Sequence, residues 1–298
     1  MAGEPTTVRE VVVAVDGSQS SNSAVAWAAC DAELRGLPLR LVHVIPPMVT
    51  PSSASSDFGS EYARFEQGRA REILDRSREL ALEATSSDRN SQISSEVLDG
   101  PIVPTLLDTS ASADIIVVGC LGQGAVARAV LGSVSSGLVQ HAHCPVAVIH
   151  AEREPAPQAP VLVGIDGSPA SELATAIAFD EASRRGVDLV ALHAWTDMGP
   201  LEFPRINWAP IEWRNVEEQE DEVLSERLSG WRAQYPDVAV HRVLVADRPG
   251  PRLLEHADEA QLVVVGSHGR GASRMLLGSV SSAIVNAAQT PVIVARRR

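Results

Sequence analysis

The 298-residue chain is short of cysteine, of positive charge and of long apolar runs. Its three cysteines are odd in number and show no CxxC spacing, so the sequence indicates neither a disulfide framework nor a zinc site. The net charge of −13 disfavours binding to nucleic acid, whose backbone needs a positive field. No apolar run approaches the roughly 18 residues that span a bilayer, and the first residues lack a signal pattern. We therefore expect a cytoplasmic protein with no membrane insertion and no nucleic-acid partner.

What the chain does have is an internal repeat. Residues 11–45 align without a gap on residues 161–195, and residues 115–136 resemble residues 262–282. The best-matched columns are Asp, Gly and Ser at the ends of apolar runs, where an α/β sheet builds a ligand site. The repeat predicts two domains of ordinary size, at 1–152 and 161–298. Between them, residues 153–160 contain three prolines and predict an exposed linker.

Each half of the sequence is typical of a doubly wound α/β domain with a five-stranded parallel sheet. Apolar, β-branched runs predict strands near 10–15, 39–45, 92–98, 114–119 and 146–150, and the second half repeats them near 161, 188, 238, 262 and 292. Helical stretches separate the strands, among them 19–35, 60–85 and 134–143. Right-handed crossovers place such helices on both faces of the sheet.

A glycine-rich motif follows the fourth strand of the first half. It consists of Gly119, two residues, Gly122, nine residues, and then Gly132 and Ser133. Glycines at a strand end let backbone N–H groups approach a phosphate, which the N-terminus of the next helix then stabilises. The alternative is that the glycines only make turns and that Ser133 caps the helix. Because the motif occurs in both halves beside the aspartate described next, we favour phosphate binding.

An aspartate ends the first strand of each half, Asp16 in one and Asp166 in the other. Where a doubly wound sheet reverses direction, a carboxylate can accept hydrogen bonds from ribose hydroxyls or from a base amino group. The alternative is helix capping, but the nearby Ser18 can perform that role equally well. Ala14 and Gly164, two residues before each aspartate, are small enough to leave room for a ring.

Together these residues resemble the ATP-binding subclass of the universal stress protein family. The aspartate after the first strand and the GxxG-x9-GS motif after the fourth are a specific signature, and the likeness covers essentially the whole chain as a tandem pair similar to mycobacterial members. The resemblance implies that Asp16 and Gly119 meet the ribose and that the backbone of Val44 meets the adenine. It assigns to the phosphates the residues of the glycine motif and the next helix, namely Gly122, Gly132, Ser133, Val134 and Ser135.

With Ala14 and Gly124 added, these residues make up the candidate site of the first half. The candidate site of the second half is the matching set of residues: Gly164, Asp166, Ala194, Gly266, Gly269, Arg270, Gly271, Gly278, Ser279, Val280 and Ser281.

The second half departs from the family pattern at one place. Eight residues rather than nine separate Gly269 from Gly278, so the second phosphate loop is one residue shorter than the first. If the two sites differ, we expect the second to bind nucleotide more weakly. Arg270 and Arg274 lie in this loop and could offer charge to the phosphates, although exposed arginines are more often only solvated.

Other motifs for the same segment fit less well. Ala125 stands where a Walker A loop needs its lysine, which disfavours a motor-type ATPase. The GxGxxA spacing of Gly122, Gly124 and Ala127 follows the fourth strand rather than the first, which disfavours a dehydrogenase. No GxSxG elbow supports a serine hydrolase.

Two histidine patterns have structural and functional interpretations. His43 and His193 recur at one repeat position, and we expect each to bond a neighbouring loop rather than to act in catalysis. His141, His143 and Cys144 resemble a metal tract, but the second half has no counterpart, so we predict no metal site.

The loops after the second strands also differ between the halves. Residues 46–60 are of low complexity, whereas residues 196–214 are rich in aromatic side chains. The second loop could be a lid over a bound ring, or its aromatic side chains could pack between subunits or over helix ends.

From the resemblance we expect a regulatory protein that binds ATP, with or without Mg²⁺, at one site per domain and acts in stress, dormancy and growth control through its nucleotide-dependent conformation. It is predicted to be a binding module rather than an enzyme, and a slow ATPase or phosphotransferase is the alternative. A third hypothesis is a scaffold with vestigial sites. The expected partners are an adenine nucleotide, a regulatory protein and a second copy of the chain, since the last strands, 146–150 and 292–296, are sheet edges that need covering.

Overall fold

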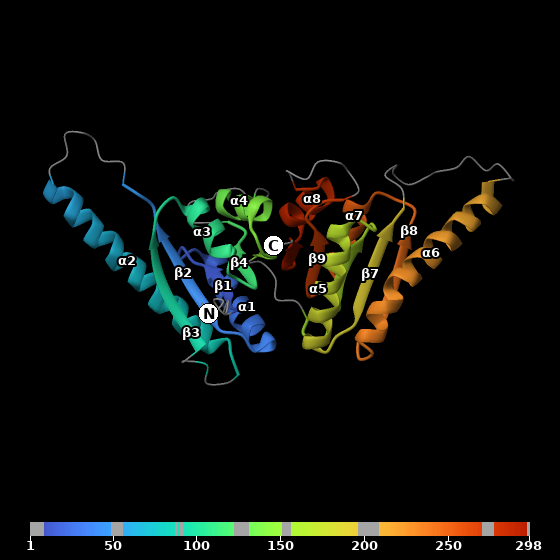
Figure 1. The fold of residues 1–298 in the computed structure, drawn as a ribbon, viewed down its shortest axis with the longest axis horizontal. Helices are drawn as coiled ribbons and strands as arrows, with labels where there is room; N and C mark the ends of the chain where they lie inside the picture. The colour runs from blue at the N-terminus through green and yellow to red at the C-terminus, as the bar shows by residue number, and fades with distance from the viewer. Residues whose placement is uncertain are drawn as a thin grey trace, which may run out of the picture. The chain divides into compact units, whose positions relative to one another are not determined.

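The computed structural model describes residues 9–48, 56–86, 89, 92–121, 131–150, 156–195, 209–269 and 277–296. The chain forms two compact units, Met1–Ala151 and Glu152–Arg297, which repeat one order of strands and helices along the chain (Figure 1). Each unit is described by itself below.

The first unit has a parallel sheet in the order β3-β2-β1-β4-β5, so the sheet reverses direction between β1 and β4. Helices α1 and α2 pack together, as do α3 and α4. The elements are β1 (Val11–Ala14), α1 (Gln19–Arg35), β2 (Leu39–Ile45), α2 (Ser56–Glu83), β3 (Ile93–Asp99), α3 (Ile102–Ser110), β4 (Ile115–Gly119), α4 (Ser133–His141) and β5 (Val146–Ile149).

The second unit repeats this topology, with its parallel strands in the order β8-β7-β6-β9-β10. Its elements are β6 (Val161–Ile165), α5 (Pro169–Arg185), β7 (Leu189–Ala194), α6 (Ala209–Gln234), β8 (Val240–Val245), α7 (Pro249–Ala257), β9 (Leu262–Gly266), α8 (Ser279–Ala287) and β10 (Val292–Ala295). Gly164 faces Leu253 of α7, whereas the next residue, Ile165, faces α6, so these two helices cover opposite faces of the sheet. The predicted fold class is confirmed.

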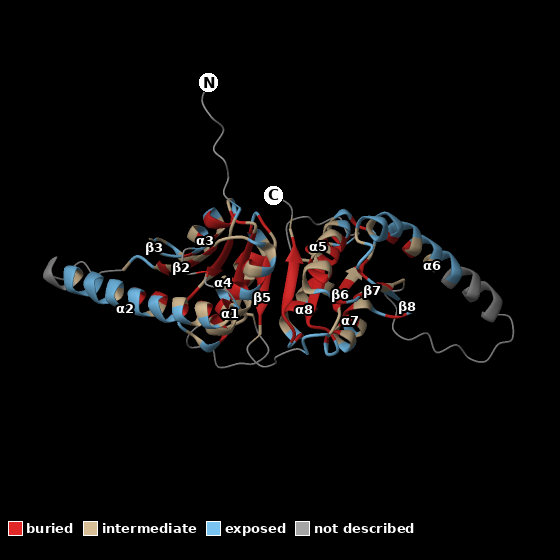
Figure 2. Cartoon of the chain, turned by 90° about the horizontal axis from the view of Figure 1, so that it is seen from below, coloured by how far each residue is buried: buried red, intermediate tan, exposed pale blue. Residues whose placement is uncertain are grey.

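The sequence explains why these segments fold as they do. The central strands are apolar at successive positions because helices cover both faces, and Figure 2 shows them buried. Ser18 begins α1 by accepting a hydrogen bond from the backbone N–H of Ser21, and Gly36 ends the helix in the left-handed conformation with a φ of 64°. Ser168 and Gly186 do the same for α5.

Helix α6 packs on α5 through aromatic side chains. Phe179 of α5 stacks on Trp231 of α6 and on Tyr235, the residue after that helix, with ring centroids 6.1 and 5.7 Å away. The Trp231 indole N–H also donates to Glu172, 2.9 Å away. These contacts hold α6 against the unit and fix the position of its inner face.

None of the helices in the described ranges is long and apolar enough to cross a membrane. In that same part of the chain, which includes His141, His143 and Cys144, no three His, Cys, Asp or Glu side chains converge as metal ligands.

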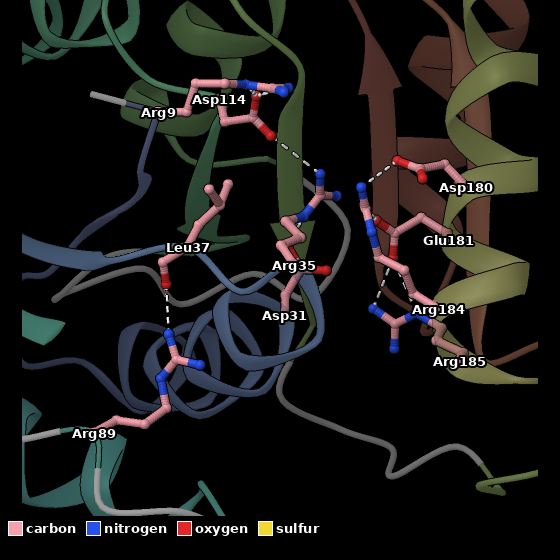
Figure 3. A network of polar contacts seen from close by, with 10 residues as sticks. All are labelled: Arg9, Asp31, Arg35, Leu37, Arg89, Asp114, Asp180, Glu181, Arg184 and Arg185. Atoms are coloured by element: carbon pink, nitrogen blue, oxygen red, sulfur yellow. Dashed lines mark hydrogen bonds and ion pairs between the residues drawn. The ribbon is translucent and has the colours of Figure 1, made fainter. Parts of the chain in front are cut away.

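Ion pairs lie in the last turns of α1 and α5 (Figure 3). In the first unit the side chain of Asp31 is 1% exposed and lies 2.6 Å from Arg35 one helical turn later. Arg35 also contacts Asp114 at the start of β4, 3.3 Å away, and Arg9 donates to the same carboxylate. In the second unit Arg184 pairs with Asp180 at the same 2.6 Å, but the Asp180 side chain is 37% exposed.

The pairs Asp31–Arg35 and Asp180–Arg184 have equal distances, so they allow a test of how burial changes the contribution of an ion pair to stability. Asp31→Ala should lower the free energy of unfolding by about 3 kcal/mol, because it leaves the Arg35 guanidinium buried with half of its compensation. Asp180→Ala should cost about 0.5 kcal/mol, because the Asp180 side chain is 37% exposed and Arg184 keeps a second carboxylate, that of Glu181, 3.8 Å away. Urea denaturation followed by circular dichroism measures both, and equal losses would contradict the interpretation.

Candidate functional site

The aspartate after the first strand of each unit closes a turn. Asp16 accepts a hydrogen bond on Oδ1 from the backbone N–H of Ser18, and Asp166 accepts one from Ser168, both at 2.9 Å. Because the serines are the N-caps, the aspartates are not, as expected from the sequence. The Oδ2 atom of Asp166 faces Gly269, where an added β-carbon would lie 2.9 Å away. The carboxylate therefore stands at the entrance of the second phosphate loop.

The N-cap serine joins this turn to the phosphate loop in both units. Ser18 Oγ donates to the carbonyl of Leu121 over 3.4 Å, and Ser168 Oγ donates to the carbonyl of His268 over 3.2 Å. Ser20 also bonds the Leu121 carbonyl. The start of the phosphate loop is thus held to the aspartate turn by hydrogen bonds between residues about 100 positions apart in sequence.

Gly119 and Gly266 have a steric role at the strand ends. A β-carbon on Gly119 would lie 2.6 Å from the carbonyl carbon of Ser20, and one on Gly266 would lie 2.8 Å from that of Ala170. The backbone at the start of α1 or α5 therefore touches the end of β4 or β9 where only glycine fits. This close approach is a structural reason for these glycines, separate from the ribose contact that the resemblance implies.

The phosphate loop returns to the strand end before the next helix begins. The N–H of Gly132 donates to Cys120 over 2.8 Å, and the N–H of Gly278 donates to Ser267 over 2.9 Å. The N-caps of α4 and α8 are these two glycines, which cap without a side chain. The alternative in which Ser133 caps α4 is therefore wrong, because Ser133 is the first residue of the helix.

An N-terminus capped by glycine offers its first-turn N–H groups to an anion. In α4 these belong to Ser133, Val134 and Ser135, and in α8 to Ser279, Val280 and Ser281. The Ser135 hydroxyl donates to Gly119 over 2.7 Å, and Ser281 donates to Gly266 over 2.5 Å, so the side chain of each fixes the helix against the strand.

The structure brings part of each predicted site together. In the second unit a β-carbon on Gly278 would lie 3.6 Å from the N atom of Gly269, which itself adjoins Asp166. Gly122, Gly124, Arg270 and Gly271 lie outside the described residues, as do Arg274 and most of the two loops predicted as lids.

The predicted ring-binding residues lie at the ends of the first two strands. Val44 and Ala194 lie near the ends of β2 and β7, beside the ends of β1 and β6. On the side of Gly164 where a β-carbon would stand, Leu253 of α7 approaches to 3.1 Å. A bound ring would therefore lie beyond Leu253 or displace it.

The comparisons with known proteins agree with this geometry. A sequence profile of the universal stress protein family matches residues 7–150 and 159–296. The chain belongs to the universal stress protein family.

Relatives in this family share the tandem length. Universal stress protein Rv1996 of Mycobacterium tuberculosis is 60% identical, with 96% of this chain and 94% of the relative aligned. Universal stress protein Rv2623 of the same species is 49% identical over 96% of each chain. A crystal structure of a universal stress protein from Archaeoglobus fulgidus superposes with a TM-score of 0.68 at 21% identity, covering 97% of this chain and 98% of that one, and shows the same fold.

Within this universal stress protein, the recurring histidine makes different contacts in the two units. His43 Nδ1 lies 2.7 Å from the carbonyl of Val15, and His193 Nδ1 lies 2.7 Å from that of Ile165, which agrees with the predicted structural role. In the second unit Nε2 of His193 also lies 3.1 Å from Glu220 on α6.

A pocket of about 240 Å³ opens beside this histidine in the second unit. Strands β6 and β7 contribute Ile165 and His193, the turn after β6 contributes Asp166 and Gly167, and α6 contributes Glu220, Val223, Leu224 and Arg227. Of these, the sequence analysis singled out only Asp166 and His193. The charged residues of α6 carry no motif and show no repeat, so no sequence signal marks them.

The loop after β8 also carries an acid that the sequence analysis did not single out. Asp247 accepts a hydrogen bond from the backbone N–H of Arg248 over 2.7 Å and one from Arg252 over 2.8 Å. The Arg248 N–H, together with Arg252, lowers the pKa of Asp247 from its ordinary value, so this carboxylate is ionised at neutral pH.

The steric role of the strand-end glycine can be tested by adding one methyl group. Gly266→Ala should lower the free energy of unfolding by about 2 kcal/mol, because the methyl group would overlap backbone atoms of α5. Gly230→Ala is the matched control, since its β-carbon would meet no atom within 4 Å and alanine favours a helix by about 0.5 to 1 kcal/mol. Urea denaturation of both variants is the measurement, and a Gly266→Ala variant as stable as the wild type would refute the steric role.

Proposed function

We propose that each unit binds one adenine nucleotide, ATP with or without Mg²⁺, and that the protein is a regulatory binding module of the stress response. The observation that carries this proposal is the repeated juxtaposition of a strand-end aspartate with a glycine-capped helix N-terminus. In the second unit Asp166, Gly269 and Gly278 adjoin one another in a continuous series. An acceptor for ribose hydroxyls beside a donor cluster for phosphate is the arrangement that a nucleotide requires.

The helix N-terminus attracts phosphate in two ways. Its first-turn N–H groups have no partner within the helix, and the helix dipole adds about half a positive charge at that end. The net charge of −13 repels free polyanions, so specific binding depends on these local donors and on magnesium carried by the nucleotide.

We favour binding over catalysis because Ala125 stands where a Walker A lysine would contact the terminal phosphates. Nucleotide binding would then select one conformation, which a regulatory protein partner in the cytoplasm would recognise. A slow ATPase or phosphotransferase is the second candidate. Phosphate release that rises well above background with Mg²⁺ would favour it, whereas bound ATP recovered intact favours the binding module.

Substitution of the two aspartates tests the proposal by stoichiometry. Asp166→Asn keeps an oxygen that can accept from Ser168 but removes the charge, so the turn should survive while ribose binding weakens. We expect isothermal titration with ATP to give two sites per chain in the wild type, one in Asp16→Asn or Asp166→Asn, and none in the double variant. The affinity of each substituted site for ATP should fall at least about tenfold, which takes the site out of the range that the titration detects.

Asp188→Asn is the control, since it removes an exposed aspartate of the same unit that pairs with His241. Unchanged stoichiometry in the double variant would overturn the proposal. We also expect the site left in Asp16→Asn to bind ATP more weakly than the one left in Asp166→Asn, because the second phosphate loop is one residue shorter.

Mass spectrometry of the supernatant after denaturing the purified protein gives an independent test. Adenine nucleotide at close to one per unit would support the proposal. The absence of nucleotide, together with the absence of binding in titration, would favour the scaffold with vestigial sites.

A further inference from the structure

Helix α6 presents an acid, two apolar residues and a base to the end of β6. Glu220 and Arg227 are seven residues apart, two helical turns, so they lie on one face with Val223 and Leu224 between them. This face forms one wall of the 240 Å³ pocket, and Asp166 and Gly167 form part of the other.

The acidic residue of this wall, Glu220, contacts a histidine of β7. Both ring nitrogens of His193 face oxygen acceptors, the carbonyl of Ile165 at 2.7 Å and the carboxylate of Glu220 at 3.1 Å. The Glu220 carboxylate is therefore held towards the end of β7 by a contact with His193. Among the described residues, Glu220 forms its ion-pair contact with His193 and none with Arg227 on the same wall.

Arg227 points its guanidinium at the turn that holds Asp166. A β-carbon at Gly167, whose φ is 76°, would lie 1.9 Å from Nη1 of Arg227, so the guanidinium occupies the place of a side chain. Throughout the described ranges, Arg227 makes no hydrogen bond or ion pair, although its five N–H donors match a phosphate well. An arginine so placed is a ready anion ligand beside the proposed ribose acceptor.

We propose that the second unit takes an adenine nucleotide that carries a phosphate on the 2′- or 3′-hydroxyl of its ribose, and that Arg227 is the residue that selects it. This inference rests on the proposed function, since it uses Asp166 as the ribose site. At the end of a strand in doubly wound folds, an acid binds unmodified ribose hydroxyls and a nearby arginine accommodates a ribose phosphate. The pocket between β6 and α6 is where such a phosphate would enter.

Helix α2, the counterpart of α6 among the described residues of the first unit, does not carry this arrangement. When the helices are aligned on their buried leucines, Leu74 of α2 and Leu224 of α6, the position of Arg227 corresponds to Ser77 and that of Glu220 to Ala70. The side chains of Ser77 and Ala70 are uncharged and buried, so neither offers charge to a ligand. Selectivity for a ribose phosphate should therefore belong to the second unit.

The test compares three nucleotides that differ only in the ribose phosphate: AMP, adenosine 2′,5′-bisphosphate and adenosine 3′,5′-bisphosphate. They are titrated calorimetrically into the full-length Asp16→Asn variant, in which the second site is the one that remains. We expect one of the bisphosphates to bind at least about tenfold more tightly than AMP, and the preferred isomer shows which hydroxyl faces Arg227.

Adding Arg227→Gln should abolish this preference and leave AMP binding within about twofold. Arg232→Gln is the matched control, because it removes the same charge from the same helix outside the pocket. A preference that persists in Arg227→Gln, or that disappears in Arg232→Gln, would overturn the role of Arg227. If AMP binds and neither bisphosphate binds more tightly, this inference fails and the proposed function stands. If none of the three binds but ATP does, this inference fails alone, whereas no binding of ATP to the same variant overturns both.

Discussion

The contact between the first turn of one helix and the end of a distant strand organises each unit. At Gly119 and Gly266 the backbone of the helix comes so close that no side chain fits, and the N-cap serine then bonds the loop that follows the strand. This contact brings the aspartate turn and the phosphate loop, about 100 residues apart, to one edge of the sheet. The helix N-terminus after the loop is positioned by the same strand end, through the hydroxyls of Ser135 and Ser281.

Around this shared frame the two units have diverged on the helix that follows the second strand. In the first unit the inner face of α2 is small, with Ala70 and Ser77 buried against the domain. In the second unit α6 is held by the stacking of Phe179, Trp231 and Tyr235 and presents charged groups to the sheet edge. Divergence on this helix changes the wall of the site without disturbing the strand-end contact, because α6 plays no part in that contact.

Much of the fold could be predicted because its signals are local. Apolar β-branched runs, serine caps and glycine ends occur in the right order twice, and the strands and helices lie close to their predicted positions. The candidate site was predictable to the extent that it uses glycine, aspartate and serine at strand ends. The steric role of Gly119 could not be predicted from the sequence, since it depends on the approach of Ser20 from another element. The sequence also did not show that Leu253, on a helix about 90 residues away, projects into the space beside Gly164.

The sequence by itself determined the doubly wound fold of each half, the family and the positions of the aspartates and glycines. These follow from hydrophobic periodicity, helix-capping residues and short motifs, which each involve only a few neighbouring residues. The tertiary structure decided which glycines are sterically required, which residue caps α4, and which side chains of a long helix face the site. These depend on contacts between segments far apart in the chain. Glu220 and Arg227 are two charged residues among many in α6 until the sheet places His193 and Gly167 opposite them.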